Sequence, residues 1–261
     1  MANELDGKVA LVTGASQGLG RQFAATLARA GATLVVASRN TQALEELAGE
    51  IAASGGTAHV VQLDVTDVES IETAVASAIE QAGAIDILIN NAGLAVNALV
   101  RDTTPEDFDL VMNTNVRGAY FVAKHVGAHM QERGSGKIVN LSSVLSEYVM
   151  PGVSVYCMSK SAISQMTKAM ALEFAGRNVQ VNALAPGFVD TEINRAFFET
   201  SRGQDLMGRF PGGALQQPQD LDSTLLFLAS SASDHLTGIT LHIDDGQSLG
   251  ALQAARKRET T

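Results

Sequence analysis

The chain has 261 residues, 46% of them hydrophobic, so it is long enough to bury the core of one large domain. Its formal net charge of −10 argues against nucleic-acid binding, which requires a basic surface. No apolar run is long enough to cross a bilayer, and the amino terminus lacks the basic and then apolar order of a secretory signal. The single cysteine, Cys157, excludes an intrachain disulfide, so we expect a cytoplasmic protein.

Apolar, β-branched runs alternate with helical patterns along the whole chain. The predicted strands are residues 9–13, 33–37, 58–62, 85–90, 137–141, 179–185 and 239–243. The predicted helices are 19–30, 42–54, 68–82, 105–133, 155–174 and 221–228, the fourth opened by the capping sequence TPED at Thr104. Strands that are almost continuously apolar are typical of a parallel sheet with helices on both faces. We therefore predict one α/β, doubly wound domain over 1–261, with ligands beyond the carboxyl ends of its strands.

The stretch TGASQGLG, Thr13 to Gly20, joins the first strand to the first helix. Glycines there let the backbone approach a ligand, and the free N–H groups of a helix amino terminus favour a phosphate. The glycines Gly14, Gly18 and Gly20 match neither the common G-x-G-x-x-G pattern nor a P-loop, because no lysine follows the last of them. A tight structural connection is an equal alternative for this turn.

The second strand ends in Ser38, Arg39 and Asn40. A site for NAD usually carries an acidic residue here, which binds the ribose hydroxyls. A guanidinium is instead suited to the 2′-phosphate of NADP, which a carboxylate would repel. The sequence therefore favours NADP(H). The alternatives are that the site binds NAD(H), or that Arg39 is a solvated residue without a role in cofactor binding.

Tyr156 and Lys160 are four residues apart in a helical pattern, so they share a face of the helix. An ammonium about 4 Å from a phenol contributes on the order of 4 kcal/mol at an effective dielectric of about 20, enough to lower a pKa of about 10 toward neutrality. We therefore predict that Tyr156 exchanges a proton with a substrate oxygen, which Ser143 holds by a hydrogen bond. The spacing is common by chance, and a packed tyrosine beside a solvated lysine is the alternative.

Seven motifs occur in order along the chain: TGASQGLG, LDVTD, NNAG, NTNVRG, LSSV, YCMSK and VNALAPGFVDT. Together they resemble the short-chain dehydrogenase/reductase family over about residues 5–246. The resemblance implies a single Rossmann-like domain with a seven-stranded parallel sheet. It also implies hydride transfer between a nicotinamide cofactor and an alcohol or carbonyl, in a homotetramer that assembles through the helices 105–133 and 155–174.

The resemblance also assigns roles to residues. Asn115, Ser143, Tyr156 and Lys160 resemble the family's catalytic four, with Tyr156 as acid and base, Lys160 on the nicotinamide ribose, and Asn115 as the anchor of a water in the proton relay. The residues that resemble the cofactor site are Gly14, Ser16, Gln17, Gly18, Leu19, Gly20, Ser38, Arg39, Asn40, Asp64, Val65, Asn91, Ala92, Gly93, Tyr156, Lys160, Pro186, Gly187, Val189 and Thr191.

Two positions depart from the family pattern. Gln17 stands where many NADP-preferring relatives have a basic residue, so the NADP preference depends on Arg39, with help from Ser38 and Asn40. Asp245 stands where relatives commonly have a second glycine, in a region that bears little on catalysis.

Residues 187–213 form a long segment without a clear strand, which is typical of a lid or binding loop. The predicted substrate pocket consists of Leu94, Val96, Leu145, Tyr148, Phe188, Ile193 and Phe197. Such a lining favours an apolar or aromatic ketone, and ordinary packing under a helical flap is the alternative. Glu147 near the same wall is the residue that would instead meet a polar substrate.

The first functional hypothesis is an NADPH-dependent carbonyl reductase, or alcohol dehydrogenase in reverse, acting on a small molecule. The alternatives are a 3-oxoacyl-carrier-protein reductase, with Arg133 and Arg177 as the dock for its acidic partner, and a sugar-acid or polyol dehydrogenase served by Glu147. A non-catalytic nucleotide-binding scaffold is disfavoured because Tyr156 and Lys160 are both present. No metal site is expected, because His125 and His129 lack further ligands at suitable spacing.

Overall fold

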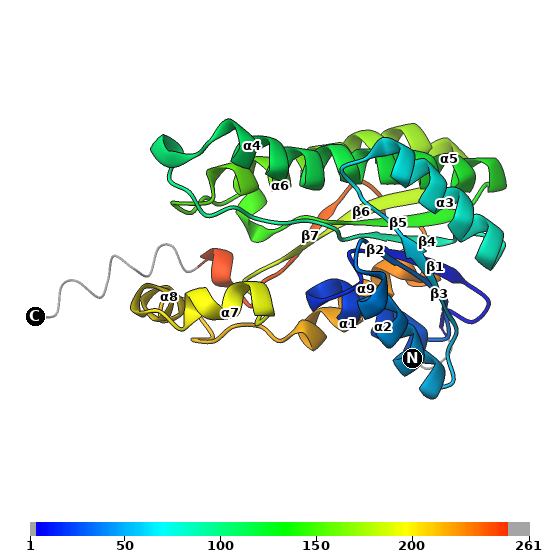
Figure 1. Ribbon diagram of the computed structural model, residues 1–261, viewed down its shortest axis with the longest axis horizontal. Helices are drawn as coiled ribbons and strands as arrows, with labels where there is room; N and C mark the ends of the chain where they lie inside the picture. The colour runs from blue at the N-terminus through cyan, green and yellow to red at the C-terminus, as the bar shows by residue number, and fades with distance from the viewer. Residues whose placement is uncertain (1–3, 250–261) are drawn as a thin grey trace, which may run out of the picture.

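The first apolar run forms strand β1 (Val9–Thr13), in which all five residues are buried because helices cover both faces of the sheet. The computed structural model describes residues 4–249 (Figure 1). Side chains alternate between the two layers, so that Ala10 and Val12 belong with Phe23 to one core cluster, while Leu11 belongs with Ile71 to the other.

Seven strands form one sheet in the order β3-β2-β1-β4-β5-β6-β7, and every pairing is parallel. The remaining bounds are β2 (Thr33–Ser38), β3 (Ala58–Gln62), β4 (Ile87–Asn90), β5 (Gly136–Leu141), β6 (Val179–Pro186) and β7 (Thr240–Ile243). The predicted doubly wound, Rossmann-like α/β fold is therefore confirmed. The strand order reverses between β1 and β4, which is where such sheets bind their ligands.

The helices lie in two layers, one on each face of the sheet (Figure 1). One layer holds α1 (Gly18–Arg29), α2 (Thr41–Ala53) and α9 (Asp222–Ala229), and the other holds α3 (Val68–Ala82), α4 (Pro105–Met112), α5 (Ala119–Arg133) and α6 (Ser154–Phe174). Short 3-10 helices occupy Val100–Asp102, Val144–Ser146, Ala175–Arg177, Pro218–Leu221 and Ser231–Ser233. Within residues 4–249, no helix combines the length and the apolar character that a membrane span requires.

The helix predicted over 105–133 begins as expected but is interrupted. Thr104 Oγ1 accepts from the Asp107 amide at 3.1 Å, and Asp107 Oδ2 accepts in turn from the Thr104 amide at 3.2 Å. A π-helix, Asn113–Gly118, then separates α4 from α5. In this turn the side chain of Asn115 bonds to the backbone of Leu94, and Gly118 lies against Val65. These long-range contacts accompany a widened turn that a continuous helical pattern does not predict.

The segment 187–213, predicted without strands, contains two short helices, α7 (Glu192–Phe198) and α8 (Ser201–Met207). They extend beyond the carboxyl ends of the strands, at the left of the view in Figure 1. Phe188 holds this segment together, because its ring stacks on Phe210 with centroids 5.4 Å apart and meets Phe198 edge-on at 5.6 Å.

Two glycines inside helices predict opposite effects of the same substitution. A Cβ on Gly127 of α5 would lie 2.9 Å from Phe174 Cζ, so Gly127→Ala should lower the free energy of unfolding by about 1–3 kcal/mol. A Cβ on the exposed Gly49 of α2 would meet nothing within 4 Å, so Gly49→Ala should raise it by about 0.5–1 kcal/mol. Urea unfolding measures both, and a change of the same sign in the two variants would contradict this account of the packing.

Candidate active site

A cleft of about 900 Å³ opens where the strands end, and its lining comes from the segments that follow six of the seven strands. This volume lies at the upper end of the range for ligand sites and suits a dinucleotide with a small substrate. The cleft spans the point between β1 and β4 where the strand order reverses.

The glycine turn after β1 has the form of an anion cradle. Gly14 and Gly18 adopt φ angles of 65° and 54°, which favour glycine. Gln17 precedes the first residue of α1 without capping it through its side chain, and the first turn holds no acidic residue. A Cβ on Gly18 would meet nothing, whereas one on Gly20 would collide with the carbonyl oxygen of Gly14. The uncapped N–H groups of α1 thus fit the pyrophosphate of a dinucleotide, and Gly20 serves the packing of the turn.

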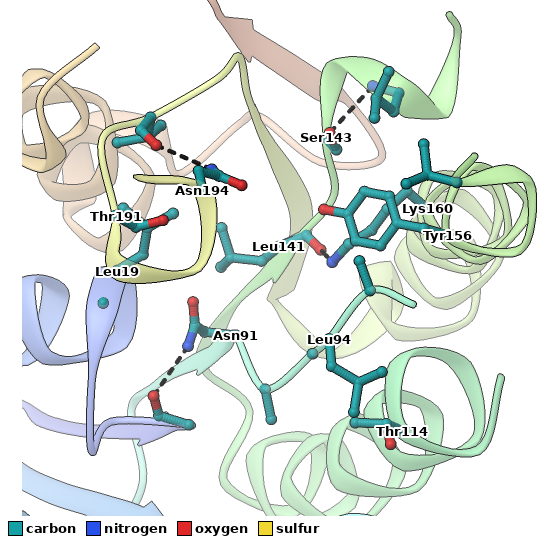
Figure 2. A pocket seen from close by; sticks show the side chains of 18 of the residues that line it. Leu19, Asn91, Leu94, Thr114, Leu141, Ser143, Tyr156, Lys160, Thr191 and Asn194 are labelled. Carbon is teal, nitrogen blue, oxygen red and sulfur yellow. Dashed lines mark hydrogen bonds between the residues drawn. The ribbon is translucent and has the colours of Figure 1, made fainter. Parts of the chain in front are cut away.

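The turn after β4 is joined directly to the glycine turn. The amides of Asn91 and Ala92 both donate to Thr13 Oγ1 at 3.0 Å, and Asn91 Nδ2 donates to the Thr13 carbonyl oxygen at 3.0 Å. Figure 2 shows Asn91 at the centre of the cleft floor, between the α1 side and the Tyr156 side. The NNAG motif therefore fixes the shape of the cleft as well as lining it.

The segment after β2 lines the cleft with a cation and has no carboxylate of its own. Arg39 and Asn40 are exposed and line the cleft, while the buried Ser38 hydroxyl accepts from the Asn40 amide at 3.2 Å. Asp64 follows β3 in the same wall. A hydrogen bond from the Thr66 amide, with minor help from Arg39, lowers the pKa of Asp64 despite its partial burial. Asp64 accepts from Thr66 through the amide and the hydroxyl, so its carboxylate is ordered within its own turn.

Tyr156 and Lys160 lie on one face of α6, next to the end of β5. Lys160 is buried, and its Nζ donates to the Leu141 carbonyl oxygen at 2.6 Å. The same nitrogen lies 5.5 Å from the centre of the Tyr156 ring. Figure 2 shows the Tyr156 hydroxyl directed toward Ser143, which follows β5. The arrangement places a phenol, an alcohol and an ammonium at one point of the cleft.

Burial dominates the acidity of this pair. It raises the pKa of Tyr156 to about 12, against the opposing effect of Ser143, and it lowers the pKa of Lys160 to about 8. The predicted lowering of the Tyr156 pKa by Lys160 is thus wrong for the protein alone. The physical reason is that both groups lose water, while Lys160 Nζ is directed at a carbonyl oxygen and not at the phenol oxygen.

Asn115 lies behind the cleft and does not line it. Its Nδ2 donates to the Leu94 carbonyl oxygen at 2.8 Å and to Ser159 Oγ at 3.0 Å, and its Oδ1 accepts from the Leu94 amide at 2.8 Å. The buried side chain therefore fixes Leu94 and the start of α6. Its role as anchor of a relay water stays a prediction.

The predicted cofactor residues converge on this cleft. Those that line it are Gly14, Ser16, Gln17, Gly18, Leu19, Ser38, Arg39, Asn40, Asp64, Val65, Asn91, Ala92, Gly93, Tyr156, Lys160, Pro186, Gly187, Val189 and Thr191. Gly20 is the exception, because it packs beneath the turn. In Figure 2, Thr191 lies over Leu19, opposite the Tyr156 wall.

Part of the predicted substrate pocket lines the cleft. Leu94, Leu145, Phe188 and Phe197 line the cleft. Val96 and Tyr148 do not, because their loops direct neighbouring residues inward instead, and Tyr148 is 39% exposed. Ile193 belongs to α7, but its side chain lies outside what the structure describes.

Glu147 also lies elsewhere than the sequence suggested. Its carboxylate is 3.7 Å from His242 Nε2 on β7, and it does not line the cleft. Arg133 of the proposed carrier-protein dock donates to Asp86 at 2.9 Å and to the Ile85 carbonyl oxygen, just before β4. Arg133 is therefore at the amino ends of the strands, away from the cleft of its own chain.

Sequence reasoning missed several residues of the cleft. Thr114, Leu141, Asn194 and Thr66 line it, and the buried Thr114 hydroxyl has no hydrogen-bond partner among the described residues. Thr66, Thr114 and Leu141 lie inside the motifs LDVTD, NTNVRG and LSSV. Asn194 follows the predicted Ile193, so membership of a motif or adjacency to a predicted residue was the available signal. No group of three metal-ligating side chains occurs among residues 4–249.

Comparison with known proteins agrees with this geometry. A family model described as enoyl-(acyl carrier protein) reductase matches residues 14–248. The 3-oxoacyl-[acyl-carrier-protein] reductase FabG of Thermotoga maritima is 38% identical over 93% of this chain and 98% of its own. The chain belongs to the short-chain dehydrogenase/reductase family. It is thus an oxidoreductase that acts on CH–OH groups with NAD(P).

Two further members of this family are closely similar. The gluconate 5-dehydrogenase of Gluconobacter oxydans is 40% identical over 93% of this chain and 95% of its own. A gluconate 5-dehydrogenase from Burkholderia cenocepacia, solved in complex with NADP and tartrate, is 38% identical and superposes with a TM-score of 0.91 over 94% of this chain and 96% of its own. Short-chain dehydrogenases of known structure therefore share the whole described fold.

The buried Lys160 predicts a pH dependence of stability. Its pKa is about 8 in the fold against 10.5 ordinarily, so between these pH values the unfolded chain binds more protons than the folded one. The free energy of unfolding should therefore rise with pH through this window, by up to about 1.4 kcal/mol per pH unit from this group. Urea unfolding at several pH values should show that Lys160→Met removes the rise. Lys168→Met, at an exposed position of α6, is the control, and an unchanged slope in Lys160→Met would refute the assignment.

Proposed function

We propose that this short-chain dehydrogenase is an NADPH-dependent carbonyl reductase, which runs in reverse as a secondary-alcohol dehydrogenase. The observation that carries the proposal is the Tyr156 hydroxyl facing Ser143 at the point where the cleft turns apolar. Leu94, Leu145 and Phe188 line that part of the cleft. A ketone seated there would have its oxygen between two hydroxyl groups and its carbon substituents on apolar side chains.

The bound nicotinamide would supply the hydride, and the protein supplies the proton and its placement. Ser143 holds the substrate oxygen, and Tyr156 donates the proton to it. Because burial raises the pKa of Tyr156 to about 12, the phenol is protonated at neutral pH and ready to act as an acid. Lys160, with a pKa of about 8, is still mostly charged at pH 7 and stabilises the phenolate that remains.

The cofactor proposed for this chain is NADP(H). Arg39 offers a guanidinium directly after β2, where an NAD site usually carries a carboxylate that would repel a 2′-phosphate. Ser38 and Asn40 lie beside it, and the relative from Burkholderia cenocepacia was solved with NADP. Gln17 adds no charge, so the preference depends chiefly on Arg39.

A sugar-acid or polyol dehydrogenase is the second candidate. The gluconate 5-dehydrogenases among the relatives support it, and so does Arg202, an exposed guanidinium on the cleft that can pair with a carboxylate. Glu147 no longer supports it, because this carboxylate faces His242. Since most of the substrate end is apolar, the ketone remains our first choice, and an assay panel of ketones, β-ketoesters and sugar acids ranks the two.

We further propose a homotetramer that assembles through the outer faces of α5 and α6. Large apolar side chains on these helices are exposed, among them Tyr120 at 47%, Met158 at 50% and Leu172 at 82%. The single cysteine, Cys157, is buried and free, which suits a cytoplasmic enzyme.

Replacement of Tyr156 by phenylalanine tests the acid role. Tyr156→Phe should lower ketone reduction by about 100-fold or more, since general acid catalysis typically contributes this much. NADPH affinity, measured by nicotinamide fluorescence, should stay within a few-fold because the ring is retained. Tyr148→Phe, at a residue that is 39% exposed and does not line the cleft, is the matched control. Retained turnover in Tyr156→Phe would refute the proposal.

Replacement of Arg39 by alanine tests the cofactor preference. A charge-assisted bond to phosphate is lost, so the KM for NADPH should rise about tenfold or more. The KM for NADH, which lacks the 2′-phosphate, should change little. Arg29→Ala, which removes an exposed arginine at the end of α1, is the control. Equal rises for both cofactors would show that Arg39 does not bind the 2′-phosphate.

A further inference from the structure

The turn that follows β7 is organised by one carboxylate. Asp244 accepts from the Gly246 amide at 3.1 Å and from the Ser248 amide at 2.9 Å. Although burial raises the pKa of Asp244, the bonds from Ser248 and Gly246 hold it below its ordinary value. The turn is therefore a defined platform, and the buried Gln247 lies within it.

Gln247 binds the backbone of a residue 59 positions earlier. Its Oε1 accepts from the Phe188 amide at 2.6 Å, and its Nε2 donates to the Phe188 carbonyl oxygen at 3.5 Å. A Cβ on Gly187 would lie 2.9 Å from Gln247 Cδ and 3.0 Å from Asp244 Cα. A glycine at 187 is thus what allows the side-chain amide to approach so closely.

The same turn also contacts the far end of the segment 187–213. A Cβ on Gly212 would collide with the Asp245 carboxylate, and one on Gly246 would lie 3.5 Å from Pro211 Cγ. The turn 244–248 therefore touches the segment where it leaves β6 and where it returns. The contact of Gln247 with the Phe188 backbone also affects the interior of the segment, because the Phe188 ring packs against Phe198 and Phe210.

We infer that Gln247 is a positioning residue that sets the place of residues 186–191 and of the Phe188 wall, and thereby the affinity for cofactor and substrate. Gln247 does not itself line the cleft. The inference rests on the proposed function and on the predicted cofactor site, to which Pro186, Gly187, Val189 and Thr191 of the cleft lining belong.

The two bonds of Gln247 are of unequal weight. The Phe188 carbonyl oxygen also accepts from the Gln216 amide at 3.1 Å. The Phe188 amide has no acceptor other than Gln247 Oε1 within residues 4–249. Without Oε1 the partly buried Phe188 amide has no acceptor. Because an unpaired buried donor is unfavourable, residues 186–191 are expected to shift until this amide is hydrogen-bonded or solvated. The acceptor atom is therefore the part of the side chain that matters.

Two substitutions distinguish the hydrogen-bonding role of Gln247 from the mere filling of space by its side chain: Gln247→Met and Gln247→Glu. Methionine keeps the length and loses the acceptor, so the Kd for NADPH and the KM for the ketone should each rise about tenfold, as the loss of one buried hydrogen bond implies. The kcat should fall less than the KM rises, because Tyr156 and Ser143 are untouched. Glutamate keeps an acceptor for the Phe188 amide and should show the smaller rise in Kd.

Nicotinamide fluorescence titration, steady-state kinetics and thermal unfolding measure these effects on the full chain. Leu249→Ala, at a residue of the same region that is 73% exposed, is the matched control and should behave as the wild type. A Kd for NADPH within twofold of wild type in Gln247→Met overturns the inference alone. A wild-type protein that binds neither NADPH nor NADH overturns the proposed function, and the inference with it.

Discussion

The hydrogen bond from Lys160 to the Leu141 carbonyl oxygen is the contact on which the site depends. It joins α6 to the end of β5 and holds a buried ammonium where water is excluded. Burial of a charge is unfavourable, which is why the pKa of Lys160 falls to about 8. The same exclusion of water keeps Tyr156 protonated, since its pKa rises to about 12. The packing of α6 against the end of β5 therefore sets both the position of the Lys160 charge and the protonation state of Tyr156.

Polar side chains at the sheet's carboxyl edge connect motifs that are far apart in the sequence. Asn90 Nδ2 donates to Asn140 Oδ1 at 3.1 Å, and Asn140 Nδ2 donates to Thr167 Oγ1 at 3.0 Å, so β4, β5 and α6 share one buried network. Thr13 joins β1 to the turn at Asn91 in the same way. Because partial loss of a buried network leaves unpaired groups, these residues fix the cleft against deformation. The presence of Thr13, Asn90 and Asn91 in family motifs thus has a structural reason besides any contact with a cofactor.

The structural features that the sequence predicts best are those that a local pattern of residues determines. The strands are recognisable because burial on both faces makes them continuously apolar, and the cleft follows from parallel strands that all end at one edge. The break in the helix 105–133 is not predictable in this way, because the bonds of Asn115 to Leu94 come from another part of the chain. The pKa of Tyr156 was missed for a related reason, since burial is a tertiary property. The contact of Gln247 with Phe188 spans 59 residues and has no local signal.

The walls of the substrate end are held by contacts separate from those that hold the catalytic pair. Ala98 and Val153 form an isolated bridge, with the Ala98 amide 2.9 Å from the Gly152 carbonyl oxygen, which ties the loop after β4 to the loop before α6. The segment after β6 is held instead by Gln247 and by a bridge between Val189 and Gln216. Tyr156 and Lys160, by contrast, lie on a long helix packed on the sheet. Substitutions in these walls can therefore change which substrate fits without moving Tyr156 and Lys160.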